Sequence, residues 1–179
     1  MKKLENYLLI KDFMFDDLNQ KHKSKMIEKF KKDVIDNPDE KKIYSNTLYE
    51  DPTYTSIISN SFLKIIEKEF TVSDITNPIR TCIYVQNNNI SSNVWHNHVN
   101  TSTINAVFYI DPPQHGGELQ LLLSNICYSI KPQKNKIYIF PYWMDHRPTP
   151  QIDTEWRISV NIEYMCNARP ILKKHNLLW

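Results

Sequence analysis

Hydrophobic positions in the first seventy residues recur at the spacing of an α-helix. A lysine-rich segment over residues 18–36 has its less polar side chains every four residues, and Asn37-Pro38 marks its end. These positions are Leu18, His22, Met26 and Phe30. A second helix is expected to begin near Asp51-Pro52, with proline in its first turn. Its apolar positions are Ile57, Ile58, Phe62, Leu63, Ile65 and Ile66. Both patterns predict packing helices, after a short extended piece around residues 7–13.

From Arg80 onward, the pattern changes to short runs of β-branched and aromatic residues separated by turn residues. Six runs are predicted to be strands: TCIYVQ, STINAVFYI, GELQLLL, ICYSI, KIYIF and WRISVNIEYM. Such runs at short spacing are typical of an antiparallel sandwich or barrel. The predicted fold is therefore mainly β with flanking α-helices. We expect one domain over residues 1–179, with a mostly helical part (1–79), a β core (80–166) and a C-terminal tail (167–179).

Composition narrows the function classes. Acids and bases nearly balance at a formal charge of +2, and the N-terminal lysines alternate with acids, so a solvated helix face is favoured over a nucleic-acid surface. Three cysteines without a C-x-x-C pair predict neither a disulfide framework nor a structural zinc site. Only two glycines occur, which excludes the glycine-rich phosphate loops. No signal peptide core or membrane span is apparent, so a cytoplasmic protein is expected.

The hexapeptide WHNHVN, residues 95–100, carries the most suggestive chemistry. In an extended chain, His96 and His98 project from the same face, as two ligands of one metal ion must. Such a pair alone is a weak signal, because it also occurs in polar loops. His146 strengthens it, since this residue follows the predicted strand KIYIF at the other end of the β core. Three nitrogen ligands would leave coordination positions open, as catalytic metal sites do.

A second candidate element lies in the strand EWRISVNIEY. Alternation places Arg157 and Ser159 on one face, and if that face is the barrel interior it carries a guanidinium and a hydroxyl into an apolar cavity. A buried guanidinium is costly unless an anion meets it, and a small dicarboxylate would supply one. The simpler interpretation is an ion pair at the edge of the strand with Asp153 or Glu155.

The ordered motifs H-x-H, INAVFYIDPP, GGELQLLL, KPQKNKIYIFPYWMDHRPTP and EWRISVNIEY resemble those of a known family. They resemble the 2-oxoglutarate and iron(II)-dependent oxygenases of the prolyl-hydroxylase-like superfamily, particularly short members from phages and marine bacteria. The resemblance covers roughly residues 80–164. It implies a double-stranded β-helix, which is a cupin-like jelly roll, packed by the N-terminal helices and holding iron at its mouth.

The resemblance also assigns roles to individual residues. It makes His96 the first iron ligand and His146 the distal one, and it makes Arg157 with Ser159 the anchor for the far carboxylate of 2-oxoglutarate. Tyr84 matches a tyrosine that helps to hold the same carboxylate in related enzymes. Position 98 departs from the family pattern, which has a carboxylate ligand there.

Two outcomes follow from this departure at position 98. If His98 ligates iron, the centre carries three neutral ligands and is one charge unit more positive than the usual two-histidine, one-carboxylate triad. If it does not, two histidines hold the metal alone, or Asp145 or Asp111 reaches the metal from elsewhere. Ligation by His98 is favoured, because it occupies the position of the usual ligand. His115 lies in a predicted turn and is expected to be exposed to solvent.

The implied reaction is oxidative decarboxylation of 2-oxoglutarate with O2, coupled to hydroxylation of a substrate C–H bond and release of succinate and CO2. The substrate would be a small molecule or a peptide, and the side chains of Trp95, Tyr142 and Trp143 could line its channel or simply pack in the core. The amphipathic helices could cover the β core or form a homodimer interface. Two rival interpretations are a cupin-type three-histidine metalloprotein that does not use 2-oxoglutarate, and a non-catalytic β-sandwich binding module.

Overall fold

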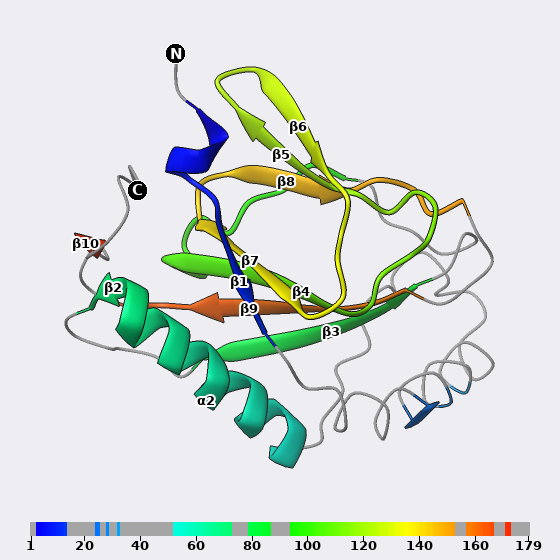
Figure 1. Ribbon diagram of the computed structural model, residues 1–179, viewed down its shortest axis with the longest axis horizontal. Coiled ribbons are helices and arrows are strands. Elements are labelled where there is room, and N and C mark those ends of the chain that lie inside the picture. The colour runs from blue at the N-terminus through cyan, green and yellow to red at the C-terminus, as the bar shows by residue number, and fades with distance from the viewer. Residues whose placement is uncertain are drawn as a thin grey trace.

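The computed structural model describes residues 3–13, 24–25, 28, 32, 52–72, 79–86, 94–152, 157–166 and 171–172. Within these ranges the fold is mainly antiparallel β with one long α-helix (Figure 1). The elements are η1 (Leu4–Asn6), β1 (Leu9–Asp12), α2 (Pro52–Glu69), β2 (Phe70–Thr71), β3 (Arg80–Gln86), β4 (Ile104–Asp111), β5 (Leu119–Leu123), β6 (Ile126–Ile130), β7 (Lys136–Pro141), β8 (Asp145–Pro148), β9 (Arg157–Tyr164) and β10 (Ile171–Leu172).

Five strands form the larger sheet in the order β1-β7-β4-β9-β3, and all neighbouring strands are antiparallel. A smaller sheet has the order β6-β5-β8, and β2 pairs with β10 separately. The hairpin between β5 and β6 turns through Ser124 and Asn125, which both have positive φ (52° and 64°). Two such residues form the type I′ turn whose twist matches that of the flanking strands. A tight local turn therefore sets the pairing of β5 with β6 in the smaller sheet.

Helix α2 covers one face of the larger sheet (Figure 1). Proline begins the helix, where its missing N–H has no partner to lose. Ile58, Phe62 and Ile66 recur every four residues and are 0%, 0% and 1% exposed. They pack against alternate residues of β4, β7 and β9, which form the outer face of the sheet: Ile104, Ala106, Phe108, Ile110, Ile137, Ile139, Ile158, Val160, Ile162 and Tyr164. The centre of the outer face is thus an apolar core, and an ion pair between Lys11 of the edge strand β1 and Glu69 of α2 (2.8 Å) lies beside it.

The other face of the larger sheet points toward the smaller sheet. A second apolar cluster forms between them, from Tyr109, Tyr138 and Phe140 of the larger sheet and Leu119, Leu121 and Leu123 of β5, with Met144 and Tyr7 beside them. The inner face also carries five buried polar residues: Asn105, Arg157, Ser159, Asn161 and Glu163. Both faces of β9 are therefore covered, one by α2 and the other by the smaller sheet.

The predicted strands agree with the structure. The six runs correspond to β3, β4, β5, β6, β7 and β9, the extended piece around residues 7–13 contains β1, and the helix expected from Asp51-Pro52 is α2. Residues 145–148 were not among the predicted runs and form strand β8, which pairs with β5 from Leu122 to Leu119. The predicted helix over residues 18–36 lies almost wholly outside the described residues, as do most of residues 167–179.

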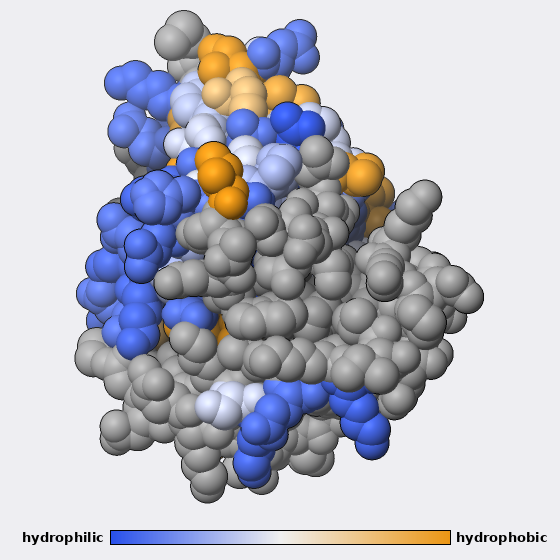
Figure 2. Space-filling model, turned by 90° about the vertical axis from the view of Figure 1, so that its right-hand side faces the viewer, coloured by the Kyte–Doolittle hydropathy of each residue, from blue (hydrophilic) through white to orange (hydrophobic). Residues whose placement is uncertain are grey.

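Among the described residues, few large apolar side chains are exposed to solvent. On the side shown in Figure 2, the described residues are mostly hydrophilic, and apolar side chains form small separate groups. Val94 and Ile152 are the most exposed of the large apolar side chains, at 67% and 75%. Among the helical residues that the structure describes, none form a segment long and apolar enough to cross a membrane.

Candidate metal centre

The backbone brings the H-x-H segment alongside β8. His96 and His146 form an antiparallel bridge, in which the N–H of His96 donates to the carbonyl of His146 (3.1 Å) and the N–H of His146 donates back (2.8 Å). The N–H of His98 then donates to the carbonyl of Tyr142 (2.9 Å). His146 lies opposite Leu121, whose side chain is buried between the sheets. The bridge therefore places the rings of residues 96, 98 and 146 together at the same end of the inner space.

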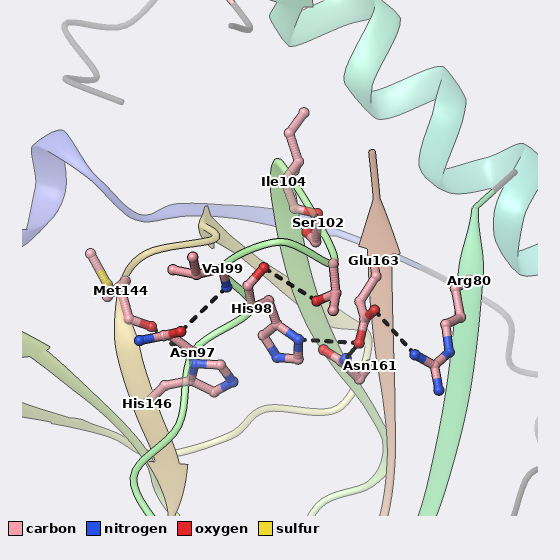
Figure 3. Close-up of polar contacts among 11 residues, drawn as sticks. Arg80, Asn97, His98, Val99, Ser102, Ile104, Met144, His146, Asn161 and Glu163 are labelled. Carbon is pink, nitrogen blue, oxygen red and sulfur yellow. Dashed lines mark hydrogen bonds and ion pairs between the residues drawn. The ribbon is translucent and has the colours of Figure 1, made fainter. Parts of the chain in front are cut away.

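Each of the three imidazoles is held through its Nδ1 atom. Nδ1 of His96 lies 3.0 Å from the carbonyl oxygen of Val94, and Nδ1 of His146 lies 3.1 Å from that of Met144. Nδ1 of His98 lies 3.1 Å from Oε1 of Glu163 (Figure 3). A carbonyl or carboxylate oxygen only accepts, so Nδ1 carries the proton in each ring and Nε2 presents a lone pair. This is the arrangement of metal-ligating histidines, whose other nitrogen is oriented by a hydrogen bond.

The three rings converge closely. The ring centroids of His96 and His146 are 4.3 Å apart, and those of His98 and His146 are 5.1 Å apart. One ligand atom from each ring lies within 4.8 Å of the other two, and small ring movements would bring all three to a shared ion. Nε2 of His98 is buried and has no hydrogen-bond partner among the described residues. A metal ion would satisfy this nitrogen, so the donor set fits the predicted metal.

Electrostatics favour a neutral, ligating imidazole at His146. Burial, and the neighbouring charge of His96, lower the pKa of His146 to about 3. Because a metal binds the unprotonated ring, His146 is ready to ligate at neutral pH without losing a proton first.

The alternative ligands proposed from the sequence are not part of this group. Neither Asp145 nor Asp111 belongs to the cluster of ligand atoms found among the described residues. The Oδ1 atom of Asp145 instead accepts a hydrogen bond from Nδ2 of Asn97 (2.8 Å). His115 is exposed in the loop after β4, as expected. Of the three proposals for the third ligand, the geometry therefore favours His98.

Arg157 and Ser159 both point into the space between the sheets. Arg157 is 3% exposed and Ser159 is 6% exposed, and both belong to the inner face of β9. Burial lowers the pKa of the Arg157 guanidinium, which nevertheless stays charged at neutral pH. Asp153 and Glu155, the partners in the simpler interpretation, lie outside the described residues. The placement is what an anchor for an anionic ligand requires.

Two tyrosines flank Ser159. Tyr84 lies opposite it on β3 and Tyr109 lies opposite it on β4. Burial raises the pKa of both hydroxyls to about 12, and at Tyr109 the charge of Arg157 opposes this rise. Tyr109 was not identified from the sequence. Strand alternation could have identified it. Asn105 is the one polar residue within the apolar part of the run INAVFYI and marks the inward-facing positions, and Tyr109, four residues later, faces the same way.

Gly117 lets the loop after β4 pack directly over Arg157. Its φ is +64°, and a Cβ atom there would lie 2.5 Å from Pro113 Cγ and 3.3 Å from Arg157 Nη1. Any side chain would therefore push against the guanidinium as well as strain the backbone. Gly117 thus allows the backbone of this loop to lie close to the Arg157 side chain.

Three buried polar residues on the same inner face were not predicted: Asn105, Asn161 and Glu163. Glu163 lies directly opposite Asn105, and Nδ2 of Asn161 donates to Oε1 of Glu163 (3.1 Å). Several of their buried atoms have no hydrogen-bond partner among the described residues: Asn105 Nδ2, Asn105 Oδ1, Asn161 Oδ1 and Glu163 Oε2. Buried polar atoms are normally paired, so this cluster beside His98 is suited to a polar ligand. The sequence signal was the alternation R-I-S-V-N-I-E, whose polar set continues past Ser159.

Of the three aromatic residues proposed for a substrate channel, two lie beside the histidines and one packs elsewhere. Trp95 is half-buried, and the Arg147 guanidinium lies over its ring at 4.5 Å from the centroid. Tyr142 is also half-buried, and its carbonyl holds His98. Trp143 packs edge-on against Tyr7 at a centroid distance of 5.5 Å, on the margin of the second apolar cluster. Trp143 therefore has a packing role, whereas Trp95 and Tyr142 adjoin the histidines.

Comparison with solved structures finds proteins of the same fold. A prolyl 4-hydroxylase from Pseudomonas putida has a TM-score of 0.55 at 11% identity, over 90% of this chain and 88% of that one. HygX from Streptomyces hygroscopicus, solved with nickel and 2-oxoglutarate bound, has a TM-score of 0.60 at 7% identity, over 91% and 83%. The chain shares the fold of these oxygenases.

A third neighbour belongs to the same group. A prolyl hydroxylase from Trichoplax adhaerens, in complex with a peptide of the hypoxia-inducible factor oxygen degradation domain, has a TM-score of 0.56 at 13% identity, over 90% of this chain and 84% of that one. No protein-family model matches the sequence, and no curated protein matches it either. At these identities the likeness establishes the fold, and the reaction must be argued from the site.

Proposed function

We propose that the protein is an iron(II)- and 2-oxoglutarate-dependent oxygenase built on a double-stranded β-helix. His96, His98 and His146 would hold the iron. The observation that carries this proposal is the convergence of three imidazoles, each held through Nδ1, at one end of the space between the two sheets. The shared fold with HygX, a protein that binds 2-oxoglutarate, supports it.

Arg157 and Ser159 would receive the far carboxylate of 2-oxoglutarate, with the hydroxyls of Tyr84 and Tyr109 on either side. A guanidinium and hydroxyls together give a carboxylate charge-assisted hydrogen bonds in a water-poor space. The apolar side chains of β5, namely Leu119, Leu121 and Leu123, close this space on the side of the smaller sheet. The chain thereby holds an anion at one end of the inner face and nitrogen ligands at the other, as orientation of a bidentate cosubstrate requires.

Iron with 2-oxoglutarate and O2 would supply the oxidising chemistry, leaving succinate, CO2 and a hydroxylated substrate. The residues of the chain would bind, orient and exclude water. The substrate would approach the histidines past Trp95 and Tyr142, and would be a peptide or a small molecule. A three-histidine metalloprotein that does not use 2-oxoglutarate is the alternative, and it leaves the Arg157 pocket without a function.

Anaerobic addition of iron(II) and then 2-oxoglutarate tests the proposal. We expect a visible metal-to-ligand charge-transfer band, followed by succinate formation when air is admitted. Arg157→Ala should lose the band at 2-oxoglutarate concentrations that saturate the wild type, while His115→Ala, an exposed histidine outside the site, should behave as wild type. Iron binding without any band or succinate would favour the alternative, and absence of iron binding would exclude both.

A further inference from the structure

Glu163 touches the one metal-site histidine that departs from the family pattern. Its Oε1 atom lies 3.1 Å from Nδ1 of His98, while His96 and His146 are held by neutral backbone carbonyls. The contact is well shielded, because the side chain of His98 is 11% exposed and that of Glu163 is 7% exposed. Of the three imidazoles, only that of His98 is held by a carboxylate. Figure 3 shows this contact between His98 and Glu163.

Glu163 is itself held in place from neighbouring positions. Asn161, two residues earlier on the same face of β9, donates to Oε1 at 3.1 Å. Nη1 of Arg80, from the adjacent strand β3, lies 3.6 Å from Oε2, near enough for an ion pair though not for a hydrogen bond. The two carboxylate oxygens are thus surrounded by an imidazole, an amide and a guanidinium, an environment that orders the side chain and suits its ionised form.

Three neutral ligands would leave the iron one charge unit more positive than the usual triad does. An ionised carboxylate hydrogen-bonded to a ligand imidazole makes that imidazole a stronger donor and returns part of the missing negative charge. Here the carboxylate is that of Glu163 on β9, and its hydrogen bond is to His98, the residue that stands where the family has a carboxylate ligand.

We propose that Glu163 is a positioning residue for His98, and that it supplies through the imidazole the negative charge that a carboxylate at position 98 would bring directly. This inference rests on the proposed metal site. It assigns to Glu163 two separable effects. The hydrogen bond keeps Nε2 of His98 directed at the metal, and the charge increases the affinity of that nitrogen for a cation.

Cobalt(II) binding to the full chain tests the inference without requiring turnover. Glu163→Gln keeps an oxygen acceptor for Nδ1 and removes the charge, so it should weaken cobalt affinity by about 10- to 100-fold and shift the visible d–d bands. Glu118→Gln is the matched control, because Glu118 is a carboxylate just before β5 that accepts a hydrogen bond from Thr149 and does not touch the histidines. It should change neither the affinity nor the spectrum.

A second pair of variants remains informative even if Glu163→Gln folds poorly. In His98→Asp, two carboxylates would compete for one buried place, and like charges so close disfavour ionisation of both. The double variant His98→Asp/Glu163→Gln removes this conflict and should bind cobalt about tenfold more tightly than His98→Asp alone, as expected for coupled residues in contact.

Each outcome separates the inference from the proposed function. Unchanged cobalt affinity and spectrum in Glu163→Gln, or equal affinity of His98→Asp with glutamate or glutamine at position 163, would overturn the positioning role and leave the metal site intact. A loss as complete as in His146→Ala would make Glu163 a direct ligand and also overturn it. Failure of the wild type to bind cobalt or iron would instead refute the proposed function.

Discussion

The two faces of the larger sheet carry opposite kinds of side chain, although they belong to the same strands. On β9, Ile158, Val160 and Ile162 face α2, and the alternating residues face the smaller sheet as Arg157, Ser159, Asn161 and Glu163. Every one of these side chains is buried. Burial alone therefore does not make a core apolar here. Apolar surface removed from water stabilises the fold, whereas buried polar groups cost free energy unless they are paired.

The outer face contributes to the stability of the fold, whereas the inner face carries the groups that can bind a ligand. The centre of the outer face is held by apolar contacts and needs no ligand. On the inner face, the amide of Asn105 is fully buried with neither atom hydrogen-bonded among the described residues, and Nε2 of His98 is in the same state. A bound ligand or metal would replace the hydrogen bonds to water that these groups lost on burial. The inner face is therefore organised for a bound state.

The largest effect on stability should come from the outer face. Phe62 is fully buried and meets Tyr164 edge-on at 6.3 Å between ring centroids. Phe62→Ala should lower the free energy of unfolding by about 3 to 5 kcal/mol, since it removes apolar contacts and leaves a cavity. Chemical denaturation measures this change. The matched variant Lys64→Ala, at an exposed position of the same helix, should alter it by less than about 0.5 kcal/mol. Metal affinity of the folded Phe62→Ala protein should match the wild type, and a specific loss of metal binding would break the division between the two faces.

On the inner face, Arg157→Met should show the opposite pattern. Loss of the guanidinium should weaken 2-oxoglutarate binding by roughly 10- to 100-fold, the range for hydrogen bonds to a charged group, with iron binding retained. Calorimetric titration of the anaerobic iron-loaded protein measures both. Arg147→Met offers the comparison, because Arg147 lies over Trp95 and bonds to Gln120, outside the Arg157 pocket. Equal losses in the two variants would show that the pocket does not bind the cosubstrate.

The smallest effect, and the most selective one, is expected at Asn105. Asn105→Leu replaces a buried amide by an apolar group of similar shape, so the protein without ligand should gain about 1 kcal/mol of stability. The same variant should gain less than the wild type from added metal and 2-oxoglutarate, because the ligand loses a polar neighbour. Thermal unfolding with and without both ligands tests this. A destabilised ligand-free variant would mean that Asn105 serves the fold rather than the bound state.

Much of the fold was predictable because its signals are local. Alternating runs gave the strands, and proline with a four-residue apolar repeat gave α2. Strand β8 was missed because the residues Asp145 to Pro148 have no apolar alternation of their own, and only pairing with β5 makes them a strand.

The site divides in the same way. His96, His98, His146 and Arg157 stand in motifs that can be read from the chain, and the structure places the three histidines together. Glu163 and Asn105 could not be assigned, because their significance depends on which residues lie opposite them. That register is fixed by the pairing of strands distant in sequence. A metal-ligating residue can therefore be predicted from a local motif, whereas the residues that contact it can be identified only from the tertiary structure.

Anaerobic equilibrium dialysis of the wild-type chain against iron(II) and 2-oxoglutarate, with both counted per chain, tests the proposed centre most directly. We predict one iron and one 2-oxoglutarate per chain, with the iron lost in His146→Ala and 2-oxoglutarate binding weakened strongly when iron is omitted. Binding of neither, or retention of stoichiometric iron after His146→Ala, would contradict a three-histidine iron centre at this site.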